Sequence, residues 1–227
     1  MSLHRTDSNV ALEPSRRIFS SSCVSGLYAI TPDEFDTTVL TRKVEMAIRG
    51  GARLVQYRNK AASLAVRGQQ IATLLPLCRA RGVPLIVNDD LVLALELDAD
   101  GLHLGGEDGD ITAARRALHG GKLLGSSCYA DLERALAAEA QGADYVAFGA
   151  AFPTATKPRA VRASLSLYRE AKSRLRVPIV AIGGITLQNA ASVLAAGVDA
   201  IAVISALFDA QDVERTAREF SDLALRR

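Results

Sequence analysis

Short apolar runs alternate along most of this chain with longer segments in which apolar residues recur every three or four positions. The short runs match strands that are buried on both faces of a parallel sheet, and the longer segments match helices that cover it. Because no run reads as a polar edge strand, the pattern predicts a closed (βα)8 TIM barrel over residues 26–227. The expected strands are 26–31, 53–58, 84–88, 101–104, 123–127, 145–149, 178–182 and 200–204.

Glycine turns and one proline define the expected helix ends. Turns at 50–52, 142–144 and 197–199 suit a helix end followed by a tight connection into a strand. Pro76 lies inside the second helical pattern and predicts a kink or an early end there. We expect the last helix to run from Leu207 to the C-terminus.

The first 25 residues lack this periodicity and are rich in serine and arginine. They contain no apolar core of the kind found in signal peptides, so we expect residues 1–25 to be a flexible N-terminal extension. Elsewhere no apolar run approaches the ~20 residues of a membrane span, which predicts that the protein does not insert into membranes.

Composition narrows the class of protein. The chain has 227 residues, of which 49% are hydrophobic, enough to bury one full core. Its 27 lysines and arginines nearly balance 25 acidic residues, which argues against a nucleic-acid partner but allows local cationic clusters to bind anionic metabolites. Cys23, Cys78 and Cys128 are too few and too scattered for a disulfide framework or a zinc site, and indicate reduced thiols in a cytoplasmic protein.

Polar side chains gather at the downstream ends of the apolar runs, where a βα barrel builds its active site. Gln56, Arg58 and Lys60 alternate along one expected strand, so their side chains share one face. If that face is the barrel interior, Leu54 packs below while the three polar groups project into the mouth and attract an anionic ligand. A solvated loop is the alternative, and the alternation favours the anion site.

Acidic side chains follow the next two strands. Asn88 and Asp89 are adjacent, so both can enter the site only if their strand ends there. A carboxylate beside a phosphate site suggests Mg²⁺, which prefers carboxylate and phosphate oxygens. Glu107, Asp108 and Asp110 follow the fourth strand, where acids are also typical of a helix N-terminus. Asp108 is therefore a candidate metal ligand only as a partner of Asp89.

His103 and Ser127 stand at the ends of strands four and five. Between two leucines, His103 is more typical of an orienting or hydrogen-bonded structural histidine than of a catalytic base. The Ser127 hydroxyl has two interpretations: it donates to a phosphate, or it caps the helix that begins near Asp131.

The remaining candidates lie on loops late in the chain. The Thr-Ala-Thr-Lys segment 154–157 sits between two prolines, which restrict the backbone and present hydroxyls, N–H groups and an ammonium. The Gly183–Gly184 pair permits close backbone approach, and Ser205 precedes the expected last helix. Loops after strands seven and eight usually form the phosphate cradle of this fold.

Together these motifs resemble those of thiamine phosphate synthases, over about residues 26–209. The resemblance implies a transferase that joins hydroxymethylpyrimidine diphosphate to a thiazole phosphate with Mg²⁺, releasing thiamine phosphate and diphosphate. In chain order, the motifs that carry it are Gln56-Tyr57-Arg58-Asn59-Lys60, Asn88-Asp89, Gly101-Leu-His-Leu-Gly105 with Asp108, Thr154-Ala-Thr-Lys157, Ile182-Gly-Gly-Ile185 and Ala202-Val-Ile-Ser205.

The resemblance also implies a role for each candidate. It implies that Asp89 and Asp108 bind Mg²⁺. Four groups are implied to be catalytic, Arg58, Lys60, Ser127 and Lys157. The pyrimidine diphosphate is assigned to Gln56, Tyr57, Arg58, Asn59, Lys60, Asn88, Ser127 and Lys157. The thiazole phosphate is assigned to Thr154, Ala155, Thr156, Gly184, Ile204 and Ser205.

Three residues depart from the family pattern. Gly106 stands where the family often has glutamine, Tyr129 where histidine is frequent, and Ala150 where proline is common, which would leave the following loop looser.

Several alternatives stay open beside the synthase. A related thiazole tautomerase relies on a histidine where this chain has Tyr129. A non-catalytic barrel that binds thiamine precursors would not require two metal carboxylates. Another phosphate-handling barrel, from tryptophan or histidine synthesis, would leave segments 56–60 and 154–157 unexplained. A homo-oligomer is compatible with the sequence.

Overall fold

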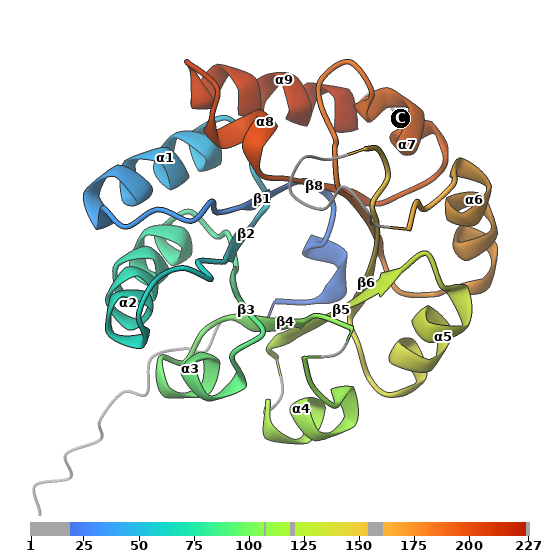
Figure 1. The fold of residues 1–227 in the computed structure, drawn as a ribbon, viewed down its shortest axis with the longest axis horizontal. Coiled ribbons are helices and arrows are strands. Elements are labelled where there is room, and N and C mark those ends of the chain that lie inside the picture. The colour runs from blue at the N-terminus through green and yellow to red at the C-terminus, as the bar shows by residue number, and fades with distance from the viewer. Residues whose placement is uncertain (1–18, 107, 119–120, 154–160, 226–227) are drawn as a thin grey trace, which may run out of the picture.

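The structure is a computed structural model that describes residues 19–106, 108–118, 121–153 and 161–225. Eight parallel strands close into a barrel in chain order (Figure 1), which confirms the predicted TIM barrel. Every strand begins and ends within two residues of its expected bounds. The strands are β1 (Gly26–Ile30), β2 (Leu54–Tyr57), β3 (Leu85–Asn88), β4 (Gly101–Leu104), β5 (Leu123–Tyr129), β6 (Tyr145–Phe148), β7 (Ile179–Ile182) and β8 (Ala200–Val203).

Helices surround the barrel as an outer layer (Figure 1). Most begin behind an aspartate or serine whose side chain accepts a backbone N–H of the first turn, as Asp131 does for Arg134 N at 3.0 Å. The helices are α1 (Thr37–Arg49), α2 (Leu64–Ala80), α3 (Leu91–Glu96), α4 (Ile111–Ala117), α5 (Leu132–Ala140), α6 (Leu165–Arg174), α7 (Ala190–Ala195), α8 (Ser205–Phe208) and α9 (Val213–Leu225).

The expected early end of the second helix at Pro76 and the expected single last helix are both wrong. Helix α2 continues through Pro76 to Ala80, because buried residues on both sides of the proline, among them Leu74 and Cys78, keep one face packed and outweigh the lost backbone hydrogen bond. The expected last helix is two helices, α8 and α9. The chain turns between them, so that α9 can pack along α1.

The hydrophobic core has two layers. The larger layer lies between strands and helices, and the smaller one fills the barrel interior. The smaller layer extends below the strands, where a short 3-10 helix, η1 (Ser21–Cys23), precedes Val24. Val24 is buried and Phe19 packs against the interior layer. Residues 19–25, expected to belong to the flexible extension, therefore cover the bottom of the barrel, and the extension's first 18 residues lie outside the described residues.

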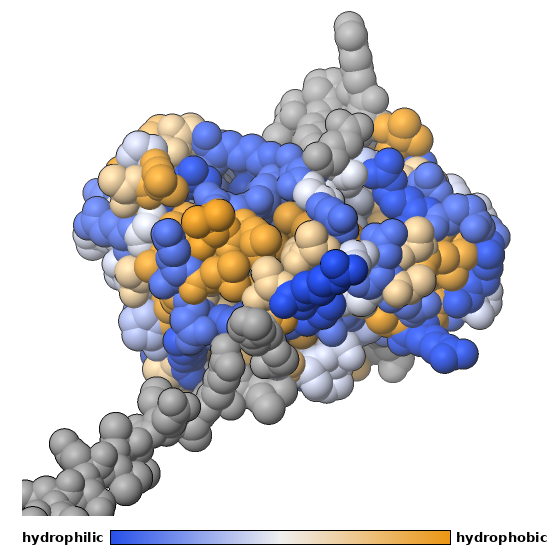
Figure 2. All heavy atoms as spheres, turned by 90° about the horizontal axis from the view of Figure 1, so that it is seen from below, coloured by the Kyte–Doolittle hydropathy of each residue, from blue (hydrophilic) through white to orange (hydrophobic). Residues whose placement is uncertain are grey.

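The surface is mixed in character. Figure 2 shows one side of the molecule, where hydrophobic residues form a group among hydrophilic ones. Helix α3 carries two exposed apolar side chains, Val92 and Leu95. Across the described ranges, no helix combines the length and the apolar character needed to cross a membrane.

Candidate active site

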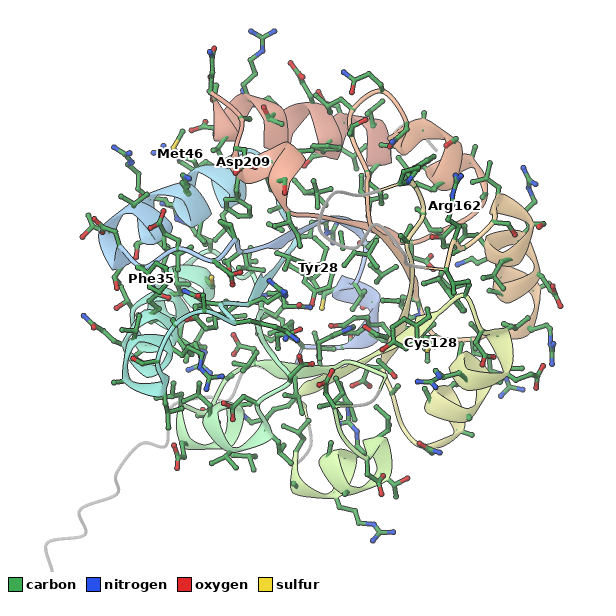
Figure 3. All side chains as sticks on the ribbon, in the orientation of Figure 1. Tyr28, Phe35, Met46, Cys128, Arg162 and Asp209 are labelled. Atoms are coloured by element: carbon green, nitrogen blue, oxygen red, sulfur yellow. The ribbon has the colours of Figure 1, made fainter. Side chains whose placement is uncertain are left out.

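A cavity of about 650 Å³ opens at the carboxyl ends of the strands. Its lower wall consists of interior residues such as Tyr28 and Val180, and Figure 3 places Tyr28 near the centre of the ring. Its upper wall is polar and comes from strand ends and from the loops that follow them. A volume of this size suits a small-molecule substrate, for which pockets typically measure about 300–1,000 Å³.

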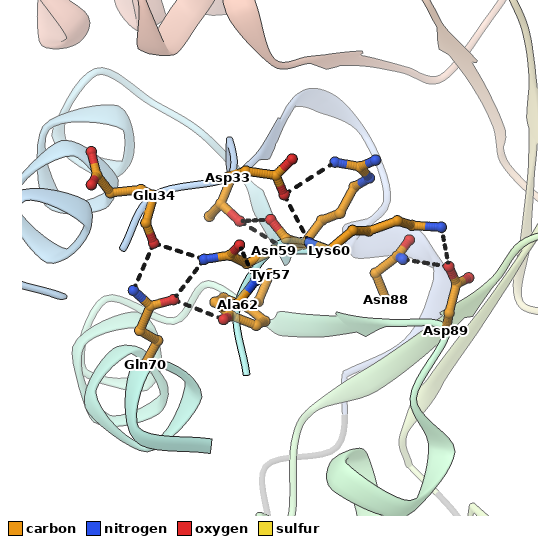
Figure 4. Close-up of polar contacts among 11 residues, drawn as sticks. Asp33, Glu34, Tyr57, Asn59, Lys60, Ala62, Gln70, Asn88 and Asp89 are labelled. Carbon is orange, nitrogen blue, oxygen red and sulfur yellow. Dashed lines mark hydrogen bonds and ion pairs between the residues drawn. The ribbon is translucent and has the colours of Figure 1, made fainter. Parts of the chain in front are cut away.

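One wall of the cavity is cationic, as the alternation along β2 predicts. Gln56, Arg58 and Lys60 all line it. The Lys60 Nζ lies 3.0 Å from Asp89 Oδ2 (Figure 4), and Arg58 Nη1 lies 3.6 Å from Asp33 Oδ1. Both cations are therefore held by single carboxylates at the rim, where they can turn to an anionic ligand.

Tyr57 and Asn59, which are also expected to bind the pyrimidine diphosphate, direct their side chains away from this cavity. The Tyr57 hydroxyl donates to Gln70 Oε1 at 2.7 Å, and Asn59 Nδ2 donates to the same oxygen at 3.2 Å (Figure 4). Alternation explains this placement, because odd-numbered positions here belong to the outer face. Their contacts with α2 instead brace the strand end that carries Arg58 and Lys60.

Strand β3 ends at Asn88, as it must if both Asn88 and Asp89 are to enter the site. Asn88 is the last strand residue, and Asp89 has a left-handed backbone with φ 60, so both side chains line the cavity. Asp89 accepts hydrogen bonds from Asn88 Nδ2 at 2.6 Å and from Gly105 N at 2.9 Å. Burial alone would raise the pKa of Asp89, but these donors and the Lys60 ammonium outweigh it and lower the pKa, which keeps the carboxylate ionised.

Asp108 meets Asp89 across Gly105. A Cβ added to Gly105 would overlap Asp108 Oδ2 and lie 3.3 Å from Asp89 Oδ1, so the two carboxylates flank this glycine. The helix N-terminus interpretation applies instead to Asp110, which accepts the N–H groups of residues 112 and 113 and caps α4. Glu107 lies outside the described residues.

His103 is a hydrogen-bonded structural histidine, as expected. Its Nδ1 lies 3.1 Å from the Tyr145 hydroxyl, and its Nε2 lies 2.9 Å from Ser127 Oγ. Burial lowers the pKa of His103 to about 4, against the opposing effect of Asp89. Ser127 lines the cavity. The cap of α5, which was the other interpretation of Ser127, is provided by Asp131.

Another part of the cavity wall is formed by glycines and the start of α8. Gly183 and Gly184 have φ values of 98 and 66. A Cβ on Gly184 would lie 2.5 Å from the Pro153 carbonyl oxygen, so only glycine fits there. Ile204 and Ser205 complete this wall. The expected contributions of Thr154, Ala155, Thr156 and Lys157 lie outside the described residues.

Two of the departures from the family pattern are physically linked. The Tyr129 ring lies 5.4 Å from the Arg134 guanidinium, and Arg134 Nη1 donates to the Gly106 carbonyl at 2.8 Å. A Cβ on Gly106 would overlap Arg134 Nη1 and lie 2.5 Å from Tyr129 Cε2. Arg134 and Tyr129 together therefore fill the space beside position 106, and the glycine accompanies this stacked pair. At the third departure, Ala150 N donates to the Val161 carbonyl at 3.1 Å, a bond that proline could not make.

The structure adds two polar residues that we did not predict. Tyr28 and Tyr145 lie side by side inside the barrel, with hydroxyl oxygens 2.8 Å apart, and Gln56 Nε2 donates to Tyr28 at 2.9 Å. The available signal was a tyrosine at an inward-facing strand position, since a buried hydroxyl usually has a partner. The fold and cavity together define a (βα)8-barrel protein with a carboxylate- and cation-lined site at the strand ends.

Comparisons with known proteins identify the family. A family model described as thiamine monophosphate synthase matches residues 27–207, and the chain belongs to this family. It is 56% identical over 198 residues to the thiamine-phosphate synthase of Aromatoleum aromaticum, covering 87% of this chain and 95% of that one. It is 55% identical over 200 residues to that of Methylobacillus flagellatus, covering 88% and 95%.

Solved structures agree with this assignment. Thiamine phosphate pyrophosphorylase from Pyrococcus furiosus superposes with a TM-score of 0.81 at 37% identity, covering 91% of this chain and 98% of that one. The geranylgeranylglyceryl phosphate synthase of Thermoplasma acidophilum has a TM-score of 0.68 at 16% identity, with 90% and 94% covered, and shows only the shared fold.

Proposed function

We propose that this chain is a thiamine phosphate synthase. It joins 4-amino-2-methyl-5-hydroxymethylpyrimidine diphosphate to thiazole phosphate and produces thiamine phosphate and diphosphate. One observation carries the proposal: a single cavity is lined both by the cations Arg58 and Lys60 with the carboxylate Asp89 and by a cradle formed by Gly184 and Ser205. A charged part and an uncharged part of one wall suit two phosphorylated substrates, which must be held together for a condensation.

In the reaction, the bond between the pyrimidine methylene carbon and the diphosphate oxygen breaks, and the electron pair leaves with the diphosphate. The electron-rich pyrimidine stabilises the resulting cation, and the thiazole nitrogen forms the new carbon–nitrogen bond. No strong protein base is required. The chain must instead bind the charge that develops on the departing diphosphate, which Arg58 and Lys60 are placed to do. Lys157, which lies outside the described residues, is expected to contribute a further cation.

The carboxylates Asp89 and Asp108 fit Mg²⁺. They flank Gly105, the lowered pKa of Asp89 keeps that carboxylate ionised, and the described residues bring no third histidine, cysteine or acid to them. An incomplete set of oxygen ligands suits Mg²⁺, which takes its remaining ligands from water and phosphate oxygens. When bound, Mg²⁺ would offset negative charge on the diphosphate as it leaves.

The site argues against the thiazole tautomerase alternative. It relies on a histidine where Tyr129 stands, and the Tyr129 ring is engaged with Arg134. A non-catalytic barrel would not require paired carboxylates beside a cationic wall.

We also place the enzyme in the cytoplasm, since its three cysteines are free. Burial raises the pKa of Cys78 and Cys128 to about 12, which makes both thiols unreactive.

Binding measurements test the division into two half-sites. Arg58→Ala should weaken pyrimidine diphosphate binding by about 10- to 100-fold, because a charge-assisted hydrogen bond contributes about 1.5–3 kcal/mol, and should change thiazole phosphate binding far less. Ser205→Ala should show the reverse preference with a smaller loss. Arg174→Ala, which removes an exposed arginine of α6, is the matched control. The opposite ranking in calorimetric titrations would mean that the half-sites are reversed.

A further inference from the structure

Five polar side chains form a continuous hydrogen-bonded series across the barrel interior, which we call the interior polar chain. It begins with Gln56 Nε2, which donates to the Tyr28 hydroxyl at 2.9 Å. The Tyr28 hydroxyl lies 2.8 Å from that of Tyr145, which lies 3.1 Å from His103 Nδ1. His103 Nε2 then lies 2.9 Å from Ser127 Oγ, at the cavity wall. The series runs from one cavity-lining residue, Gln56, through the barrel interior to another, Ser127.

Counting protons fixes the direction of each bond. Gln56 donates to Tyr28, so the single proton of the Tyr28 hydroxyl is available for Tyr145, the only other partner that the described residues provide for it. Tyr145 in turn donates its proton to His103 Nδ1. A neutral imidazole that accepts at Nδ1 carries its proton on Nε2, and therefore donates to Ser127.

Packing holds the interior polar chain in this arrangement. The His103 ring stacks on the Tyr145 ring with centroids 5.5 Å apart, and the Tyr28 ring meets Tyr145 edge-on at 6.0 Å. A Cβ on Gly125 would overlap the Tyr145 ring and lie 2.5 Å from His103 Nδ1, so this glycine leaves the space that the pair occupies. Among the described residues, the two ring nitrogens of His103 hydrogen-bond to neutral hydroxyls, those of Tyr145 and Ser127, and to no carboxylate.

We propose that Tyr145 and His103 are positioning residues that make Ser127 an acceptor toward His103, and so direct the Ser127 hydroxyl proton into the cavity. The inference rests on the proposed function, in which that proton meets the departing diphosphate. If the hydrogen bonds ran in the opposite direction, Ser127 would donate its hydroxyl proton to His103 Nε2. Only the lone pairs of the Ser127 oxygen would then face the anionic diphosphate. A donor that is already aimed at the developing charge needs no reorientation during the reaction.

The tautomer of His103 can be measured without any substrate. The protein has three histidines, and His103→Gln identifies the signals of this one in proton–nitrogen spectra of protein labelled with ¹⁵N-histidine. We expect Nε2 to carry the proton and Nδ1 to be bare, and Tyr145→Phe to remove this preference. A wild-type spectrum with the proton on Nδ1 would overturn the inference. This result does not depend on turnover, so it is separate from the failure of the proposed function.

Kinetics then test whether Tyr145 acts through Ser127. Tyr145→Phe should lower kcat about tenfold, a fraction of the ~10²-fold loss typical of a missing oxyanion donor, with little change in the KM for the pyrimidine diphosphate. In a Ser127→Ala background, Tyr145→Phe should cost nothing more. Tyr168→Phe is the control, because its buried hydroxyl donates to the Phe148 carbonyl outside the cavity. Losses that multiply in the double variant would refute the positioning role.

Discussion

Gly105→Ala offers a way to disturb the proposed metal site without changing either carboxylate. The backbone of Gly105 is not in the left-handed region, so alanine is allowed there. Its Cβ would overlap Asp108 Oδ2 and lie 3.3 Å from Asp89 Oδ1, so the Asp108 carboxylate must move. Metal–oxygen distances tolerate only about 0.2 Å, and Mg²⁺ holds its ligands near 2.1 Å. The displaced oxygen can no longer bind a metal that stays on Asp89.

We expect the apparent Mg²⁺ affinity to fall by about 10- to 100-fold, the usual effect of a disturbed ligand environment, which equals about 1.4–2.7 kcal/mol. The assay is the initial rate of diphosphate release as a function of Mg²⁺ concentration. Gly109→Ala is the matched control in the same loop, because the atoms nearest to its Cβ would be those of the Leu104 side chain, at 3.3 Å and beyond. A folded Gly105→Ala variant with unchanged Mg²⁺ dependence would refute Asp108 as a metal ligand.

Two further predictions concern stability. The lowered pKa of Asp89 means that its carboxylate stabilises the native state above its unfolded pKa near 3.8, and that this contribution is lost as pH falls through the lower folded value. The difference in unfolding free energy between wild type and Asp89→Asn should therefore shrink in acid, and a constant difference would contradict it. Gly106→Ala should cost about 1–3 kcal/mol through overpacking against Arg134 and Tyr129, and combining it with Arg134→Ala and Tyr129→Ala should relieve most of that cost in urea unfolding; additive effects would disprove the coupling.

The fold and the cationic wall follow from simple periodicities in the sequence. Apolar runs set the strand positions, and alternation along β2 places Gln56, Arg58 and Lys60 in the cavity. The same alternation excludes Tyr57 and Asn59, which were included because the resemblance treats the motif as one block. At these two positions the period of the strand matches the observed direction of the side chains.

Contacts across the barrel could not be predicted in the same way. Tyr28 and Tyr145 are 117 positions apart, and only closure of the barrel brings their hydroxyls together. The link between Gly106 and Tyr129 likewise depends on how β5 and the loop after β4 meet. In the sequence, Gly106 and Tyr129 appeared as two separate departures from the family pattern. Only the structure shows that the Tyr129 side chain occupies space beside Gly106.

The central claim is that one cavity condenses two phosphorylated substrates, and product stoichiometry tests it most directly. Purified protein is incubated with the pyrimidine diphosphate, the thiazole phosphate and Mg²⁺, and thiamine phosphate and diphosphate are both quantified over time. We expect equal amounts of the two products, and no thiamine phosphate when either substrate is omitted. Binding of both substrates without formation of thiamine phosphate would contradict it.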